Sequence, residues 1–530
     1  MIEKVEELLP LVENPARYLG REINTYVKKK YEVKIAIGYP DIYEIGMSSL
    51  GLRILYGIAN ERNDCVCERF FLPWIDMESL MRKEGISLFT LETKTPLNKF
   101  DMIGISLSSE LNYTNFLNIL YLSDIPIFAY ERKNEHPLII VGGNSAFNPL
   151  PLVPFVDAFF IGEGEEVFNE IIDIIKENKD NRYKILENLN KIDSIFVPLL
   201  KKEKVKKAIV KDLDNSFFPL KYLVPLTEIT HDRISIEIMR GCVQGCKFCQ
   251  AGSCWKPVRI RSYNKILEIA KEVYKNTGYE EISLLSFSAG DHPQIEKIVT
   301  KLVEEFKLKN VSISFPSLRI DTFSFQLALK IKEIKKTNLT FAPETSERLR
   351  KNLGKKITDE ELLNLAIQAK ANGYRHIKLY FMIGLPDESE EDIDEIIKLI
   401  TEISKVIFVH ISFNTFIPKP HTSYQTERFI KKEEYETKRI YITEKLKRNK
   451  YVKFNFHPYE TSFIECILSR GDEELSKVIY NTWKKGNKFE NWKEFFKFKN
   501  WLESFEEEKV SIDKYLGYLK PPFKWDFIKL

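Results

Sequence analysis

The sequence lacks the features that would mark a membrane, secreted or repeat protein. Its 530 residues contain no apolar run near the ~20 residues that a membrane-spanning helix needs. Residues 1–7 show no basic segment followed by an apolar one, which is the layout of a secretory signal. No internal repeat and no low-complexity segment is present. With 44% hydrophobic and 30% charged residues, the composition predicts an ordinary globular protein without a membrane partner.

An excess of charge is also missing. The chain has 80 Lys and Arg residues against 77 Asp and Glu residues, which gives a net charge of +3. This balance provides no overall field that would attract nucleic acid. A local basic run at residues 201–207 is more typical of solvated surface. Nucleic acid stays open as a substrate, but charge does not indicate it.

Cysteine is scarce, with seven residues and no even, regularly spaced set. Disulfide frameworks are typical of secreted proteins, so this scarcity predicts a reducing, cytoplasmic environment.

Three of the cysteines lie in one short loop, as Cys242, Cys246 and Cys249. Thiolates are the usual ligands of iron–sulfur clusters, and three of them leave one iron of a four-iron cluster without a protein ligand. An open metal position can bind a small molecule. A zinc site is the alternative, but zinc needs four ligands and Cys254 breaks the usual paired spacing. The spacing favours a ligand-binding cluster over a zinc knuckle or chance clustering.

The hydrophobic pattern divides the chain into parts of different kinds. Residues 1–200 are predicted to hold a doubly wound parallel sheet, because short apolar runs alternate with helical patterns. Its expected strands are residues 32–38, 101–106, 137–142 and 157–162. Several end in glycine or serine, and such sheets bind ligands beyond the carboxyl ends of their strands. Residues 201–230 are predicted to be a charged linker.

Strands and helices alternate again over residues 231–430. The expected strands are residues 234–240, 281–287, 311–315, 339–342, 377–383 and 407–417. These βα units are too few to close an eight-stranded barrel, so we predict an open, partial (β/α)6 barrel. Residues 431–530 are predicted to be a mostly helical extension with a strand-like segment at 451–456. Its interleaved aromatic and basic residues could stack on bases, but packing is the expected role.

The cysteine loop resembles that of the radical S-adenosylmethionine (SAM) enzymes. The resemblance implies a [4Fe-4S] cluster on Cys242, Cys246 and Cys249, with the open iron chelating the amino and carboxylate groups of SAM. It further implies reductive cleavage of SAM to methionine and a 5′-deoxyadenosyl radical. The electron is expected from an external one-electron reductant such as flavodoxin or ferredoxin. Phe248 is expected to pack beside the cluster and exclude water.

Later segments resemble superfamily motifs in the same order. Residues 286–291 stand where a Gly-Gly-Glu-like turn is usual, but their sequence departs from it. Residues 342–349, 379–389 and 416–422 are similar to motifs of the methylthiotransferase-like group. The implied contacts to SAM are Ser288, Gly290, Asp291, Ser314, Ser317, Arg319, Glu344, Met382 and Gly384. No catalytic residue beyond these is assigned.

The N-terminal part resembles the cobalamin-binding domains that precede the core in one class of radical SAM proteins. Their fingerprint is an Asp-x-His-x-x-Gly loop, then Ser-x-Leu, then Gly-Gly. Residues 106–108 and the Gly142-Gly143 pair resemble the last two elements. Residues 44–51, which stand at the first element, contain no histidine, and the only histidine of the N-terminal part is His136. Bound cobalt would therefore lack a protein imidazole, which in the class favours methyl transfer; a vestigial domain is the alternative. The implied contacts to cobalamin are Gly46, Ser48, Gly51, Ser106, Gly142, Gly143 and Glu163.

The leading interpretation is a cobalamin-dependent methyltransferase with an unknown substrate. One alternative is a cobalamin-independent radical SAM enzyme that modifies RNA or protein and recognises it with the N-terminal part. Another is a non-catalytic carrier or sensor. A methylthiotransferase proper is disfavoured, because that group carries three further cluster cysteines in this part, where only Cys65 and Cys67 occur. Cys254 could donate hydrogen near the cluster, but an inert thiol is the simpler expectation.

Overall fold

The computed structural model describes residues 1–314 and 339–530. Its N-terminal part is built on a six-stranded sheet in the order β2-β1-β3-β4-β5-β6. The strands are β1 (Val33–Tyr39), β2 (Cys65–Phe71), β3 (Met102–Ser106), β4 (Leu138–Gly142), β5 (Ala158–Phe160) and β6 (Ile195–Phe196). The first five are parallel, and β6 is antiparallel to β5. The predicted parallel sheet is confirmed, with β2 as an additional strand.

Helices cover both faces of this sheet. On one face, α4 (Leu50–Glu61), α7 (Phe168–Glu177) and α8 (Arg182–Lys191) bury apolar side chains against the strands. On the other, α1 (Ile2–Leu8), α5 (Ile75–Glu84) and α6 (Tyr113–Leu122) do the same. The strand order reverses between β1 and β3, and ligands bind beyond the carboxyl ends of such strands at that point.

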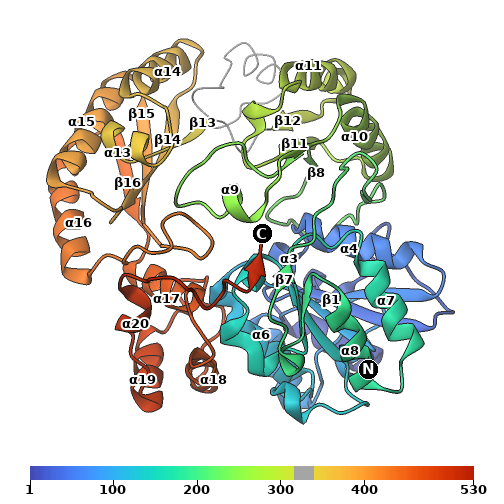
Figure 1. Cartoon of the computed structure of the whole chain (residues 1–530). Helices are drawn as coiled ribbons and strands as arrows, with labels where there is room; N and C mark the ends of the chain where they lie inside the picture. The colour runs from blue at the N-terminus through green and yellow to red at the C-terminus, as the bar shows by residue number, and fades with distance from the viewer. Residues whose placement is uncertain (315–338) are drawn as a thin grey trace.

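The central part consists of two parallel sheets with helices on their outer sides (Figure 1). The first holds β8 (Ile234–Glu237), β11 (Glu281–Leu285) and β12 (Ser312–Ser314), with helices α10 (Tyr263–Thr277) and α11 (Ile295–Phe306). The second holds β13 (Leu339–Glu344), β14 (His376–Ile383), β15 (Phe408–Thr415) and β16 (Val452–Phe456), with helices α14 (Asp359–Ala371), α15 (Glu390–Val406) and α16 (Lys432–Leu446). All six predicted strands are present, and β16 comes from the predicted helical extension.

The two sheets are separate in the described residues. No pairing joins β12 to β13 there, so the predicted single partial barrel remains a prediction. Local sequence sets the starts of two helices of the second sheet. Thr358 with Glu361, and Ser389 with Asp392, form capping boxes that satisfy backbone donors at the first turns of α14 and α15.

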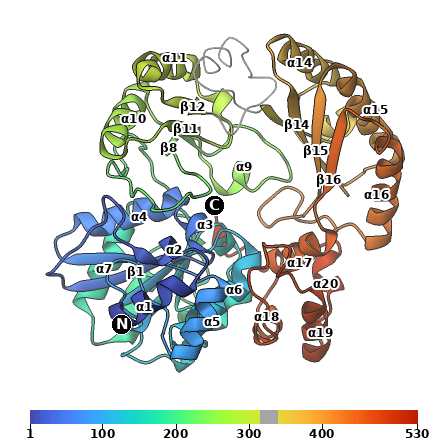
Figure 2. The ribbon, with the colours of Figure 1, turned by 180° about the vertical axis from the view of Figure 1, so that it is seen from behind.

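The C-terminal part returns to the N-terminal part. Its helices are α17 (Tyr459–Ser469), α18 (Leu475–Lys484), α19 (Phe498–Glu508) and α20 (Asp513–Leu516). Side chains of α17, α18 and α19 join the same apolar core as those of α5 and α6. The last strand, β17 (Ile528–Lys529), pairs with β7 (Val205–Lys206) of the predicted linker. Figure 2 shows α18 and α19 beside α5 and α6 from behind.

No helix within residues 1–314 or 339–530 is long and apolar enough to cross a bilayer.

Candidate active site

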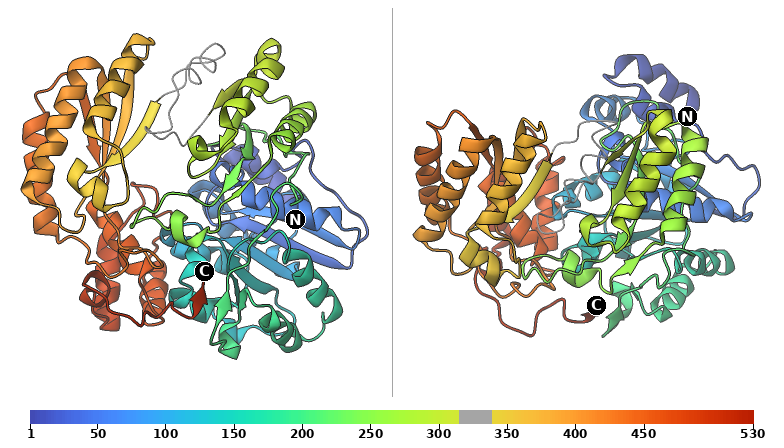
Figure 3. Two further views of the ribbon diagram at one scale, coloured as in Figure 1. Left: turned by 45° about the horizontal axis from the view of Figure 1, so that its top comes forward. Right: turned by 90° about the horizontal axis from the view of Figure 1, so that it is seen from above.

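The cysteine loop lies at the carboxyl end of β8. It follows the two-residue strand β9 (Met239–Arg240) and runs into the short helix α9 (Ala251–Cys254). Gly241 starts the loop with a φ of +86°, and a Cβ there would lie 2.6 Å from the carbonyl oxygen of Trp255. Only glycine fits this position, because a side chain would collide with backbone. The views in Figures 1 and 3 place α9 between the two central sheets and the N-terminal part.

The three predicted cluster cysteines are close enough to influence one another. Burial raises the pKa of the Cys246 thiol, Lys355 lowers it, and Cys249 and Cys242 raise it further. All three cysteines are partly exposed. Among the described residues, no three His, Cys, Asp or Glu side chains converge to hold a single metal ion. Tetrahedral zinc requires such convergence, whereas the cysteines of a cubane bind different irons, so the donor set fits a cluster better than zinc.

The first central sheet meets the loop through one polar contact. The Gln244 amide nitrogen donates to Asp291 at 3.0 Å, and the Ser288 hydroxyl donates to the same carboxylate. Ser288 is fully buried, and Gly290 lies beside it in a short 3-10 turn. The structure thus brings Asp291, and with it the turn that holds Ser288 and Gly290, to the cysteine loop; their contact with SAM stays a prediction.

The second central sheet meets the loop on its other side. The backbone N–H of Lys247 donates to Leu353 at 3.1 Å. The Phe248 ring packs in a small apolar cluster with Met382 and with the aromatic residue Phe416. This packing supports the prediction that Phe248 shields the site from water.

Two further predicted residues lie at the strand ends of this sheet. Glu344 forms a 2.7 Å ion pair with Lys355, the same lysine that influences Cys246. Gly384 has a φ of +87°, and its N–H donates at 2.8 Å to Glu388. Burial raises the pKa of Glu388 although Lys438 and the backbone donors oppose it. The sequence motifs do not indicate Lys355, because it acts through Glu344 and Cys246, which lie elsewhere along the chain. Glu388 falls within a motif, but its contact with the Gly384 backbone is not predicted.

The remaining predicted SAM residues are not brought to the loop in the described structure. Ser314 donates at 2.8 Å to Glu281, which starts β11 at the amino end of that sheet. Ser317 and Arg319 lie outside the described residues.

The predicted cobalamin residues lie along the carboxyl edge of the N-terminal sheet. Ser106 and Gly142 end β3 and β4. A Cβ at Gly143 would lie 2.4 Å from the carbonyl oxygen of Leu107, and one at Gly46 would lie 2.2 Å from the Phe71 ring. Packing within the N-terminal part therefore explains these two glycines without a ligand.

Two other predicted residues in this part also have protein partners. The Ser48 hydroxyl donates to the carbonyl of Glu44 at 2.7 Å and accepts from the backbone of His231 at 3.0 Å. Gly51 is exposed in the first turn of α4, where a side chain would meet little.

Glu163 is buried, and two arginines balance its charge. Both of its carboxylate oxygens accept from Arg259, at 2.8 and 2.7 Å, and one also accepts from Arg240 at 3.0 Å. This ion pair joins the end of β5 to the strands that flank the cysteine loop.

The same carboxyl edge contacts the cysteine loop and the segment after β15. Asn144 donates to the Gln250 side chain at 3.2 Å, and Gln250 donates to the carbonyl of Pro420 at 3.1 Å. The His421 ring lies 2.8 Å from the carbonyl oxygen of Phe147. The edge where such sheets bind ligands therefore faces the predicted cluster.

A buried lysine completes this junction. Lys419 forms ion pairs with Glu110 at 2.9 Å and with Glu465 of α17 at 2.8 Å. Burial acts to lower the pKa of Lys419, but the two carboxylates outweigh it and hold that pKa above its usual range.

The other candidates are either fully buried or on the opposite edge of the N-terminal sheet. His136 lines a pocket of about 250 Å³ at the amino edge of the sheet, opposite the predicted cobalamin edge. Cys254 is fully buried, and burial raises its pKa to about 12, as expected for an inert thiol. Cys65 and Cys67 are also fully buried, in β2.

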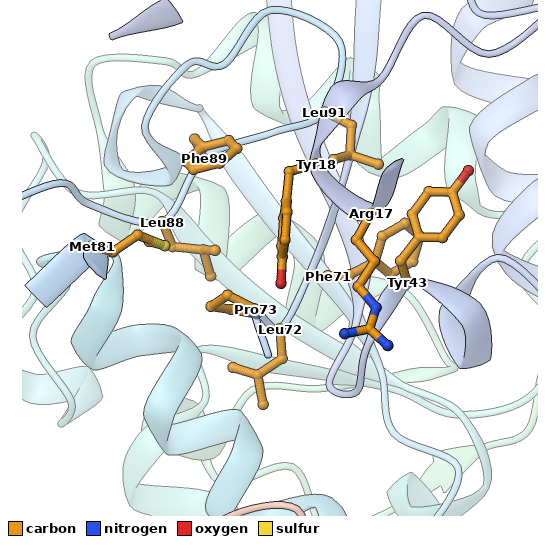
Figure 4. Close-up of a pocket in the computed structure, with 10 residues that line it drawn as sticks. All are labelled: Arg17, Tyr18, Tyr43, Phe71, Leu72, Pro73, Met81, Leu88, Phe89 and Leu91. Atoms are coloured by element: carbon orange, nitrogen blue, oxygen red, sulfur yellow. The ribbon is translucent and has the colours of Figure 1, made fainter. Parts of the chain in front are cut away.

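A small apolar pocket lies near the carboxyl end of β2 (Figure 4). The Tyr18 ring points into it beside Pro73 and Leu72, and its hydroxyl accepts from the backbone of Trp74 at 3.0 Å. Its volume of about 10 Å³ is no more than one water requires, so we assign no ligand to it.

Comparisons with known proteins agree with this arrangement. A family model described as the radical SAM superfamily matches residues 236–400, and one described as the N-terminal region of radical SAM proteins matches residues 51–198. The uncharacterized protein MJ0966 of Methanocaldococcus jannaschii is 30% identical over 449 residues, covering 84% of this chain and 90% of that protein. The uncharacterized methyltransferase PH0819 of Pyrococcus horikoshii is 25% identical, covering 62% and 69%.

Two solved structures share the fold. The radical SAM methyltransferase TsrM of Kitasatospora setae, with cobalamin and a [4Fe-4S] cluster bound, matches with a TM-score of 0.51 at 12% identity, covering 74% of this chain and 77% of that one. The cobalamin-dependent radical SAM enzyme OxsB with aqua-cobalamin matches with a TM-score of 0.51 at 13% identity, covering 78% and 56%. Together with the cysteine loop and the family models, these findings show that the chain belongs to the radical SAM superfamily, which implies a [4Fe-4S] cluster and SAM as cofactors.

Proposed function

We propose that the protein is a radical SAM methyltransferase that uses cobalamin bound at the carboxyl edge of the N-terminal sheet. The observation that carries the proposal is the 3.2 Å contact between Asn144, just beyond β4, and Gln250, next to the third cluster cysteine. A ligand on that edge would lie beside the cluster. The shared fold with two cobalamin-binding enzymes supports the same arrangement.

The residues of the chain have separable tasks in this proposal. The three cysteines hold the cluster, which supplies one electron to SAM when bound. The Phe248 cluster excludes water from one side of the loop. The Gln244–Asp291 contact and the Glu344–Lys355 pair fix the strand ends that surround SAM. We further propose an external one-electron reductant such as flavodoxin or ferredoxin as partner. Cobalamin, when bound, supplies a methyl carrier.

Anaerobic reconstitution with iron, sulfide and hydroxocobalamin tests the proposal. We expect desalted protein to keep stoichiometric corrinoid, seen in its visible spectrum, and to form 5′-deoxyadenosine from SAM when reduced. Cys246→Ala should abolish the cluster signal and SAM cleavage. Cys254→Ala is the matched control, because it removes a fully buried thiol that is not a predicted cluster ligand. If the protein cleaves SAM but retains no corrinoid, the proposed use of cobalamin is excluded, whereas the assignment as a radical SAM enzyme stands.

A second candidate is a cobalamin-independent radical SAM enzyme that modifies RNA or protein. One observation favours it: the segments that follow β3 and β5 are already joined to the rest of the chain through Glu110 and Glu163. Two proteins named tRNA-2-methylthio-N(6)-dimethylallyladenosine synthase are 23% and 24% identical to this chain, and their name indicates a tRNA product. SAM cleavage without corrinoid in the experiment above would select this candidate.

A further inference from the structure

The second central sheet has two chemically different faces. Ile377, Leu379 and Ile411 join the apolar core beneath helices α14–α16. Because side chains alternate along a strand, the residues between them point to the opposite face. Figure 1 shows that this opposite face, here called the inner face, is turned toward the first central sheet. Its residues on β14–β16 include His376, Lys378, Tyr380, His410, Ser412, Asn414, Lys453 and Asn455.

Four of these residues form a compact group, which we call the basic patch: His376, Lys378, His410 and Lys453. His410 stands directly between the two lysines, in register with Lys378 on β14 and with Lys453 on β16. The rings of His376 and His410 stack with centroids 4.9 Å apart and planes 19° from parallel.

The basic patch is not balanced by acid in the described residues. Burial lowers the pKa of His410, and its neighbours His376, Lys453 and Lys378 lower it further. No carboxylate within residues 1–314 or 339–530 pairs with either lysine. Other lysines of this part do pair, such as Lys355 with Glu344 and Lys438 with Glu388. The ammonium groups of Lys378 and Lys453 lie on either side of β15 and repel one another, so an anion bound between them would relieve the repulsion.

We infer that the basic patch binds a phosphate group of the substrate. Lysine ammonium groups and imidazoles are suited to phosphate, and the Phe408 ring, 5.2 Å from that of His410, offers an apolar surface beside it. The inference rests on the proposed function in one respect, that the inner face is the substrate side of a radical SAM enzyme. Phosphate could come from a nucleic-acid backbone or from a small phosphate ester.

The basic patch would bind the phosphate at a distance from the cysteine loop. Met382, beside the cysteine loop, lies four residues along β14 from Lys378, or about 13 Å at ~3.3 Å per residue. The phosphate therefore lies well away from the atom that reacts. Binding energy from such a remote group helps to orient the substrate at the reacting centre.

Binding measurements on the full chain test the inference. The probes are a fluorescein-labelled ten-nucleotide RNA, followed by anisotropy, and pyrophosphate as its competitor. We compare Lys378→Gln/Lys453→Gln with Lys398→Gln/Lys447→Gln, which removes the same charge at exposed positions on the helical side. We expect the first pair to weaken RNA binding at least tenfold and the control by less than twofold. The slope of log Kd against log salt should fall by about 0.7, for one phosphate contact on a single strand.

The outcomes separate the sources of phosphate. Competition by pyrophosphate that is lost in the patch variant supports the inference for any phosphate ester. Loss of RNA binding alone supports a nucleic-acid backbone, and loss of pyrophosphate binding alone supports a small ester. Equal affinities in the two double variants, or no binding of either probe at 1 mM, overturn the inference. Formation of 5′-deoxyadenosine, assayed separately on the same preparations, shows whether the proposed function fails independently.

Discussion

Gly142 and Gly143 are neighbours at the end of β4, but their surroundings differ. Gly143 has a φ of +100° and faces the Leu107 carbonyl, whereas a Cβ at Gly142 would meet nothing closer than 3.7 Å. We expect Gly143→Ala to lower the free energy of unfolding by about 1–3 kcal/mol. Gly142→Ala should change it by less than about 0.5 kcal/mol. Urea unfolding of both variants measures this, and equal losses would contradict the assigned backbone role of Gly143.

Glu490 should make stability depend on pH. Burial raises its pKa from 4.5 to about 7, although Trp501 and Asn487 donate to the carboxylate and lower it. A carboxyl whose pKa is higher in the folded state stabilises the fold while protonated, and this contribution is lost as pH rises from about 4.5 to about 7. The Glu490→Gln variant cannot ionise. Its melting temperature relative to the wild type should therefore rise between about pH 4.5 and pH 7; a constant difference would show that Glu490 ionises normally.

At the scale of elements, the strands that sequence predicts are those with an apolar run or a regular alternation of apolar and polar residues. The six strands of the central part follow from such patterns, and β15 alternates along its whole length. The pattern does not predict β2, because Glu68 and Arg69 occupy its centre and charged residues usually mark surface. In the structure all seven residues of β2 are buried. Arg69 is neutralised by Glu22 and Glu92, which lie 47 and 23 positions away and are invisible to a local pattern.

The buried ion pairs of β2 lead to a stability prediction. Arg69→Met should destabilise the protein by about 3–5 kcal/mol, because it leaves the buried Glu22 and Glu92 carboxylates without their counter-charge. Adding Glu22→Gln and Glu92→Gln should restore most of the loss. Chemical denaturation of the single and triple variants measures both steps. A triple variant as unstable as Arg69→Met would show that packing of the arginine, and not its charge, holds β2.

At the scale of the whole molecule, sequence motifs locate the candidate site but not its connections. The order of the motifs predicts the cysteine loop, Glu344 and Met382, because each lies just after or within a predicted strand. The contacts of Asn144 with Gln250 and of Lys419 with Glu110 join residues 106 and 309 positions apart. Such pairs depend on how the parts pack together, and no local pattern contains that information. The same holds for β17, which pairs with a segment predicted to be a linker.

Lys419 links three parts of the chain, so its loss should be felt in all of them. Lys419→Met leaves Glu110 and Glu465 facing each other in a buried junction, and their repulsion should loosen both attachments. We expect faster amide hydrogen exchange in residues 107–122, 416–422 and 459–469 together, with α10 unchanged as an internal reference. Adding Glu110→Gln and Glu465→Gln should slow exchange again, because the repelling charges are removed. Faster exchange confined to residues 416–422 would contradict this prediction. It would mean that apolar packing, and not the ion pairs of Lys419, holds the three parts together.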